Sequence, residues 1–77
     1  QKWDIQVGAF SSRDNAEKKA QDLIKAGFDE VALQTQKSTN IIRVVIRNVD
    51  TSKLNSIESK LKQKGFSEYT IRERTLK

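Results

Sequence analysis

A short pattern occurs twice in this chain, and the duplication limits the folds that the sequence can adopt. The pair Gly27-Phe28 recurs as Gly65-Phe66, 65 − 27 = 38 residues later. Val7 is matched in the same way by Ile46, at an offset of 46 − 7 = 39. Because the offset is nearly constant, we expect two copies of one supersecondary unit rather than two unrelated halves.

The first copy has the signals of a strand, a helix and a second strand. Apolar and polar or small residues alternate over 3–10, which is the period of a strand with one covered face. A helix is expected over 11–26, with Ser12 as its N-cap and Gly27 as the left-handed residue that ends it. Its apolar residues are spaced to share one helix face: Ala16, Ala20, Leu23 and Ile24. A second strand is predicted over 31–36.

The second copy repeats this order. After a turn at 37–40, the β-branched stretch 41–49 predicts a strand. A helix capped by Asp50 or Thr51 follows, and its apolar positions Leu54, Ile57 and Leu61 again share one face. Gly65 ends this helix, and the last strand is expected over 69–72.

Two βαβ copies predict an α/β (α+β) fold of the ferredoxin-like, split βαβ type. The half-repeats cover about 3–36 and 41–74 within one domain, 1–77, because a chain of 77 residues has room for a single core. Right-handed crossovers place both helices on one face of a four-stranded antiparallel sheet. The other face of the sheet is left open.

The composition excludes several kinds of site. The chain has no His and no Cys, so a zinc site, a Cys nucleophile and any His-based triad are ruled out. No cofactor or metal is expected, and no acidic pair is predicted on the open face, so we do not expect an enzyme. No apolar run is long enough for a membrane span. The net charge of +5 favours an acidic partner, although a solvated lysine-rich surface explains it equally well.

Strand parity identifies the residues of the open face, since side chains alternate between the two faces of a sheet. The set consists of polar, small and arginine side chains that could bind a hydroxyl-rich or anionic polymer: Gln6, Gly8, Ala32, Gln34, Gln36, Arg43, Val45, Arg47, Thr70, Arg72 and Arg74. A merely solvated polar face is the alternative.

The stretch Ile5-Gln-Val-Gly-Ala-Phe10, the following Ser11-Ser-Arg-Asp-Asn-Ala16, and the later Gly27-Phe28 and Ile42-Arg-Val-Val-Ile46 together resemble the SPOR (sporulation-related repeat) family. The resemblance implies a bacterial cell-envelope module, periplasmic or extracytoplasmic, that forms part of a larger protein. It also implies binding to peptidoglycan glycan strands stripped of stem peptides, and a role at the division septum.

The resemblance places family positions on particular residues. Strand and helix-start positions of the family fall on Gln6, Gly8, Ser11 and Asn15, and its second-half arginine falls on Arg43. With the open-face residues, the predicted ligand-binding set is Gln6, Gly8, Ser11, Asn15, Gln34, Arg43, Val45, Arg47 and Arg72. The chain departs from the family at 47–49, where Gly, Pro and an aromatic are usual. An added arginine there could strengthen binding to acidic groups or fill space that the glycan would occupy.

Two other functions remain open on the sequence alone. Single-stranded RNA binding fits the fold order and the positive charge, but RNA-recognition domains stack bases on strand aromatics, and the open face has none. Nucleic acid is therefore not the expected partner. A protein-protein interaction module is the third possibility, because Val45 is expected to be exposed.

Overall fold

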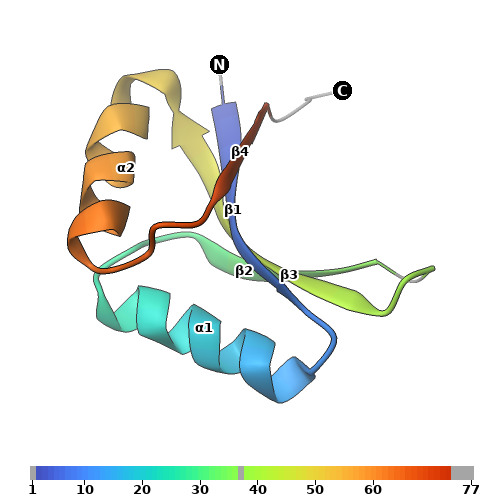
Figure 1. Cartoon of the computed structure of the whole chain (residues 1–77). Coiled ribbons are helices and arrows are strands. Elements are labelled where there is room, and N and C mark those ends of the chain that lie inside the picture. The colour runs from blue at the N-terminus through green and yellow to red at the C-terminus, as the bar shows by residue number, and fades with distance from the viewer. Residues whose placement is uncertain (1, 37, 74–77) are drawn as a thin grey trace.

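A four-stranded antiparallel sheet and two helices make up the protein (Figure 1). The computed structural model describes residues 2–36 and 38–73. The elements follow the order β1 (Lys2–Phe10), α1 (Arg13–Lys25), β2 (Val31–Gln36), β3 (Ile41–Asp50), a 3-10 turn (Thr51–Lys53), α2 (Leu54–Gln63) and β4 (Thr70–Glu73). The strands lie in the order β2-β3-β1-β4, so β1 and β3 are central and adjacent. The predicted ferredoxin-like fold is confirmed.

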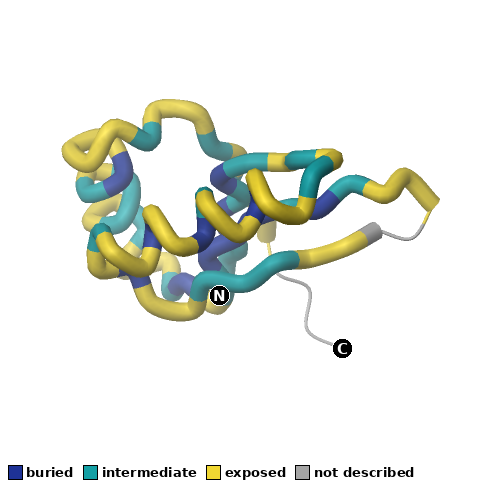
Figure 2. The backbone as a smooth tube through the Cα atoms, turned by 90° about the horizontal axis from the view of Figure 1, so that it is seen from below, coloured by how far each residue is buried: buried dark blue, intermediate teal, exposed yellow. Residues whose placement is uncertain are grey.

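A single apolar core lies between the sheet and the helices. Its buried residues come from both layers, with Ile5, Val44 and Ile46 from the central strands and Leu23 and Leu61 from the helices. These five side chains are the largest that are fully buried, and none is more than 2% exposed. Along α1, exposed positions alternate with buried ones (Figure 2), as the predicted amphipathic pattern requires.

One residue of the predicted helix face is not buried. Ile24 was expected to lie on the apolar face of α1, but its side chain is 51% exposed. At about 100° per residue, Ile24 lies at the edge of the stripe that Ala16, Ala20 and Leu23 define, so it faces solvent beside the core.

Both helices end at the predicted glycines. Gly27 and Gly65 have φ of 94° and 89°. At the first stop the Phe28 amide donates to Leu23 O at 3.1 Å, and at the second the Phe66 amide donates to Leu61 O at 2.8 Å. These are the bonds of a Schellman motif, in which the residue after the glycine reaches back to the last turn.

The two helix starts differ from one another. Ser12 caps α1 as predicted, since its Oγ accepts the Asn15 amide at 3.4 Å. The prediction that Asp50 or Thr51 caps α2 was wrong, because a 3-10 turn precedes α2 and Asp50 makes no side-chain cap bond. Both side chains instead hold the start of β1: Asp50 pairs with Lys2, and Thr51 Oγ1 accepts Trp3 Nε1 at 2.8 Å.

Two β-bulges interrupt the pairing of β1 with β3. In β1, Val7 is an extra residue between the pairs Gln6↔Val45 and Gly8↔Val44. In β3, the extra residue lies between the pairs Trp3↔Val49 and Ile5↔Ile46, so that Asp4 faces both Arg47 and Asn48. A bulge shifts the alternation of side chains beyond it. Both bulges therefore change which residues reach the open face.

The last strand is offset by one residue from the prediction. It begins at Thr70 rather than Tyr69, and residues 70–73 pair with residues 3–6 of β1. Tyr69 packs against the core from just before the strand, and its hydroxyl donates to Glu58 Oε1 of α2 at 2.9 Å.

Candidate functional site

A hollow of about 330 Å³ lies on the face of the sheet opposite the helices. We call it the open-face hollow. All four strands contribute to its lining, which consists of Asp4, Gln6, Gln34, Arg43, Val45, Arg47, Arg72 and Glu73. Six of the nine predicted site residues are therefore brought together: Gln6, Gln34, Arg43, Val45, Arg47 and Arg72.

The strand register explains this convergence. Val45 of β3 pairs with Gln6 of β1 on one side and with Ala32 of β2 on the other. Gln34 pairs with Arg43 one step along the same face. Paired residues project from the same side of a sheet, about 5 Å apart, so these side chains form a continuous strip across β2, β3 and β1.

Val45 is the apolar floor of this strip. The sequence predicted it to be exposed, but its side chain is only 3% exposed, and this prediction was wrong. The hollow's lining includes two arginines of the same strand, Arg43 and Arg47, and the long apolar stems of arginine can cover apolar surface while the charge stays in water. Val45 is therefore not the exposed apolar contact point on which the protein-protein interaction alternative depended.

The arginines of the hollow are available for a ligand. Within residues 2–36 and 38–73, the ion pairs are Lys2–Asp50 and Arg13–Glu17. Neither involves Arg43, Arg47 or Arg72, and the arginine side chains make no hydrogen bond to a described residue. Arg43 and Arg47 are half-buried and Arg72 is exposed.

Two acidic residues of the hollow were missed by the sequence reasoning. Asp4 and Glu73 both line it, contrary to the expectation of no acidic pair on the open face. Asp4 Oδ1 accepts the Asn48 amide at 3.1 Å, which holds the bulge of β3. The alternation in 3–10 does put Asp4 on the same face as Gln6, and this signal could have identified it.

Three predicted site residues do not line the hollow. Beyond the β1 bulge, Gly8 pairs with Val44 on the helix side, so its assignment to the open face was wrong, and Ala9 takes that place opposite Arg43. Ser11 and Asn15 are exposed at the start of α1, away from the lining residues. The predicted open-face residue Arg74 and the side chain of Gln36 lie outside the described part of the structure.

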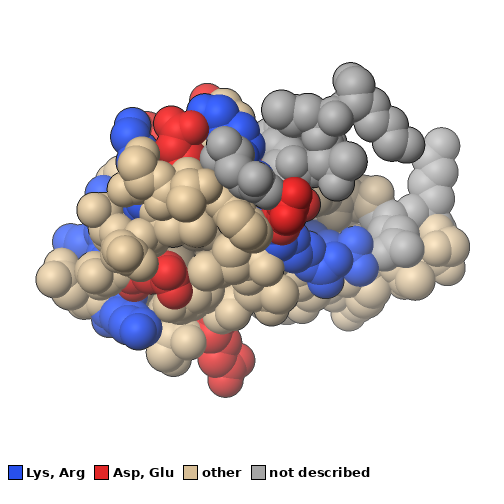
Figure 3. All heavy atoms as spheres, turned by 90° about the horizontal axis from the view of Figure 1, so that it is seen from above, with Lys and Arg blue, Asp and Glu red and all other residues tan. Residues whose placement is uncertain are grey.

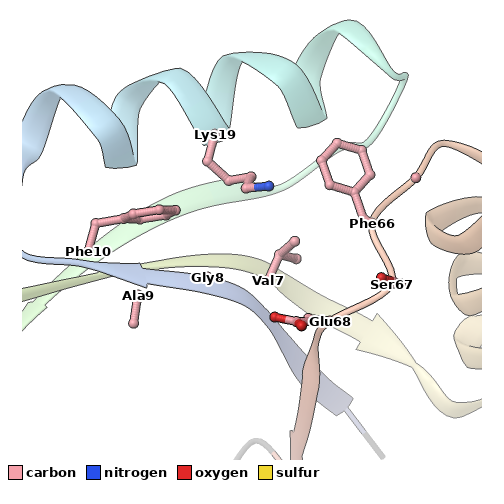
Figure 4. Close-up of a pocket in the computed structure, with 9 residues that line it drawn as sticks. Val7, Gly8, Ala9, Phe10, Lys19, Phe66, Ser67 and Glu68 are labelled. Carbon is pink, nitrogen blue, oxygen red and sulfur yellow. The ribbon is translucent and has the colours of Figure 1, made fainter.

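A second hollow, of about 410 Å³, lies on the helix side along β1 (Figure 4). Phe10, Lys19 and Phe66 face it, with Glu68 at its rim. The Lys19 ammonium lies 5.0 Å from the Phe66 ring centroid, so the charge and the ring already contact each other. Phe10 and Phe66 also pack against the core, as expected. This hollow therefore presents fewer unengaged polar groups than the open-face hollow.

The surface charge is mixed rather than uniformly basic on the side shown in Figure 3. Lys and Arg side chains form separate groups there, with Asp and Glu side chains between them. No cluster of three or more potential metal ligands occurs among the residues that the structure describes. None of the described helices is long and apolar enough to cross a membrane.

Comparison with known proteins gives one match. A family model described as SPOR domain matches residues 1–72 of the chain. Neither a curated protein nor a solved structure matches it.

Proposed function

Because the chain belongs to the SPOR domain family, we propose that it is a non-catalytic module that binds peptidoglycan glycan strands through the open-face hollow. The family is known for septal peptidoglycan binding, is non-catalytic in general, and occurs in bacterial cell-envelope proteins. In this proposal the module directs a larger parent protein to the cell wall or the division septum.

The observation that carries the proposal is the convergence of Gln6, Gln34 and Arg43 on one hollow with a closed apolar floor. Glycan strands present hydroxyl and amide groups along both edges and apolar C–H faces on the rings. Amide and guanidinium groups match the polar edges, and a concave site with an apolar floor and a few placed polar groups is typical of ligand sites. The preferred ligand in this proposal is a glycan strand without stem peptides.

Cosedimentation with purified sacculi tests the proposal. Binding of the wild type is measured before and after amidase treatment, alongside Gln6→Ala and Arg43→Ala. Each variant should bind treated sacculi several-fold more weakly, since a lost hydrogen bond costs about 0.5–1.5 kcal/mol, and more where charge assists. Lys18→Ala is the control, because Lys18 is exposed on α1, on the opposite face.

Retention of full binding by both folded variants would locate the site elsewhere. An RNA pull-down serves as the competing test, because single-stranded RNA binding is the alternative for this fold. The lining of the hollow contains no aromatic ring on which a base could stack, which disfavours RNA. Enrichment on RNA with none on sacculi would reverse the assignment.

A further inference from the structure

Three arginines line the open-face hollow, and no carboxylate of a described residue forms an ion pair with them. Arg43 and Arg47 come from β3 and Arg72 comes from β4, and all three line the same hollow. Among the described residues, no carboxylate forms an ion pair with any of them. A ligand made only of neutral sugar hydroxyls could be bound by hydrogen bonds without three positive charges.

The two acids of the hollow offset the charge of the arginines only in part. Asp4 and Glu73 lie at the same end of the sheet, where Asp4 pairs with Arg72 and Trp3 pairs with Glu73 in the register. Asp4 also accepts a backbone amide from the β3 bulge. Arg43 lies at the other end of the strip, where its strand neighbours are Ala9 and Gln34. The balance of three arginines against two carboxylates leaves the hollow cationic.

A guanidinium group presents paired N–H donors that match a carboxylate in bidentate geometry. In a glycan strand of peptidoglycan, the carboxylate available is the lactyl group of muramic acid. A stem peptide converts that group to a neutral amide, and removal of the peptide restores the negative charge. A carboxylate attached directly to the sugar ring is therefore present only after the peptide has been removed, and this is the group that the arginines can pair with.

We infer that Arg43, Arg47 and Arg72 bind free lactyl carboxylates of muramic acid along the strand, so that the carboxylate on the sugar favours stripped strands over peptide-bearing ones. This inference rests on the proposed function and adds the group that is recognised. Arg47 adds a second guanidinium group from β3 to the hollow.

The test compares two forms of one ligand. Soluble glycan fragments released from amidase-treated sacculi carry free carboxylates, and carbodiimide coupling to methylamine converts these to neutral amides. Binding of the whole 77-residue chain to both forms is measured by calorimetry. The wild type should bind the carboxylate form about tenfold more tightly, as expected for a charge-assisted contact.

Variants identify the groups that are responsible. Arg47→Gln and Arg72→Gln should each weaken binding to the carboxylate form by about tenfold and to the neutral form less than twofold, which is the signature of a direct coupling. Lys18→Gln removes the same charge from α1 and should change neither affinity. Thermal melts confirm that every variant is folded.

Two results would overturn the inference in distinguishable ways. If the wild type binds both forms equally, or if the arginine variants lose the same factor on each, the carboxylate is not recognised and glycan binding still stands. If neither form binds at all, the proposed function fails as well, and the inference falls with it.

Discussion

Val45 shows how one residue supports the site without contacting solvent. Its side chain projects from β3 toward the open face and lines the hollow, yet it is only 3% exposed. A valine in this place gives the hollow a dry floor.

Replacement of Val45 by alanine should therefore destabilise the fold, by about 1–2 kcal/mol for the two methyl groups lost and the space left behind. Urea denaturation measures this change. Ile24→Ala is the matched control: Ile24 is 51% exposed on α1, and its replacement should cost less than about 0.5 kcal/mol. Equal effects of the two substitutions would mean that Val45 is not buried.

At the scale of elements, the two helix ends are built alike and meet in space. The Phe28 and Phe66 rings that follow the stop glycines contact edge to face, with centroids 6.3 Å apart. Lys60 of α2 reaches across to the first stop, where its Nζ donates to Gly27 O at 2.8 Å and lies 4.8 Å from the Phe28 centroid. Each stop therefore supports the packing of the other helix.

Gly27→Ala and Gly65→Ala should each destabilise the protein by about 1 kcal/mol, because both glycines have positive φ. The two glycines have similar positive φ values but different surroundings, so comparing them shows whether a new side-chain contact adds to the backbone strain. A Cβ at Gly65 meets nothing within 4 Å, whereas a Cβ at Gly27 lies 2.9 Å from Lys60 Nζ. Because Lys60 Nζ ends a flexible side chain that can move aside at little cost, thermal melts should show losses of similar size at both sites. Gly65→Asn should be milder than Gly65→Ala, since Asn tolerates this conformation. Alanine variants that melt at or above the wild-type temperature would contradict the account.

Tyr69 links α2 to the start of β4, and its titration reports on that link. The hydrogen bond to Glu58 raises the pKa of Tyr69 above its ordinary value of 10.0, with burial as a second cause. The raised pKa means that the contact stabilises the fold fully below about pH 10 and is lost as the pH rises through the folded-state pKa.

Tyr69 is the only tyrosine of the chain, so tyrosinate absorbance follows it alone. The folded protein should titrate at higher pH than the urea-unfolded chain, and Glu58→Gln should reduce the difference. Glu17→Gln, on α1, should leave it unchanged. Identical titration curves in the folded and unfolded states would show that Tyr69 and Glu58 are not in contact.

The sequence predicted the order of the strands and helices better than it predicted which side of the sheet each side chain lies on. The spacing of apolar residues and the repeated Gly-Phe helix stops were sufficient to predict the order of strands and helices. Both are local features, and helix ends in particular depend on local chemistry. The misassignment of Gly8 has a different cause. Parity holds only along an uninterrupted strand, and the bulge at Val7 arises from pairing with β3, which the local pattern does not encode.

The second bulge, at Arg47 and Asn48, is held by contacts from three parts of the chain. Asn48 adopts φ of 61°, a conformation that Asn enters more readily than most residues. Its amide is held by Asp4, and the neighbouring Arg47 amide donates to Glu30 O at 2.9 Å. These contacts join β3 to β1 and to Glu30, the residue just before β2. Because the partners are far apart in the sequence, no single segment could predict them.

For the whole molecule, the net charge of +5 is less informative than its distribution. The charges are mixed on the surface seen in Figure 3, and the arginines of the hollow are few. A glycan strand also carries far fewer charges per unit length than a nucleic acid. Long-range electrostatics should therefore contribute modestly to binding.

Retention on amidase-treated sacculi should accordingly fall by less than about tenfold between roughly 50 and 200 mM salt, because a sparsely charged glycan, unlike a nucleic acid, has no condensed counterion layer to release. A salt series in the cosedimentation assay measures the slope. The Arg72→Gln variant should show a shallower slope than the wild type, and Lys18→Gln should not. A collapse of several orders of magnitude would indicate binding to a polyanion instead.

The most direct test of the central claim, that glycan strands bind across the open-face hollow, is an NMR titration of the labelled domain with stripped glycan fragments. Amide and side-chain signals of Gln6, Gln34, Arg43 and Val45 should shift together with increasing ligand, while signals of the outward faces of α1 and α2 stay in place. Shifts confined to the helices or to the hollow beside Phe10 and Phe66, with Gln6 and Arg43 unperturbed, would contradict it.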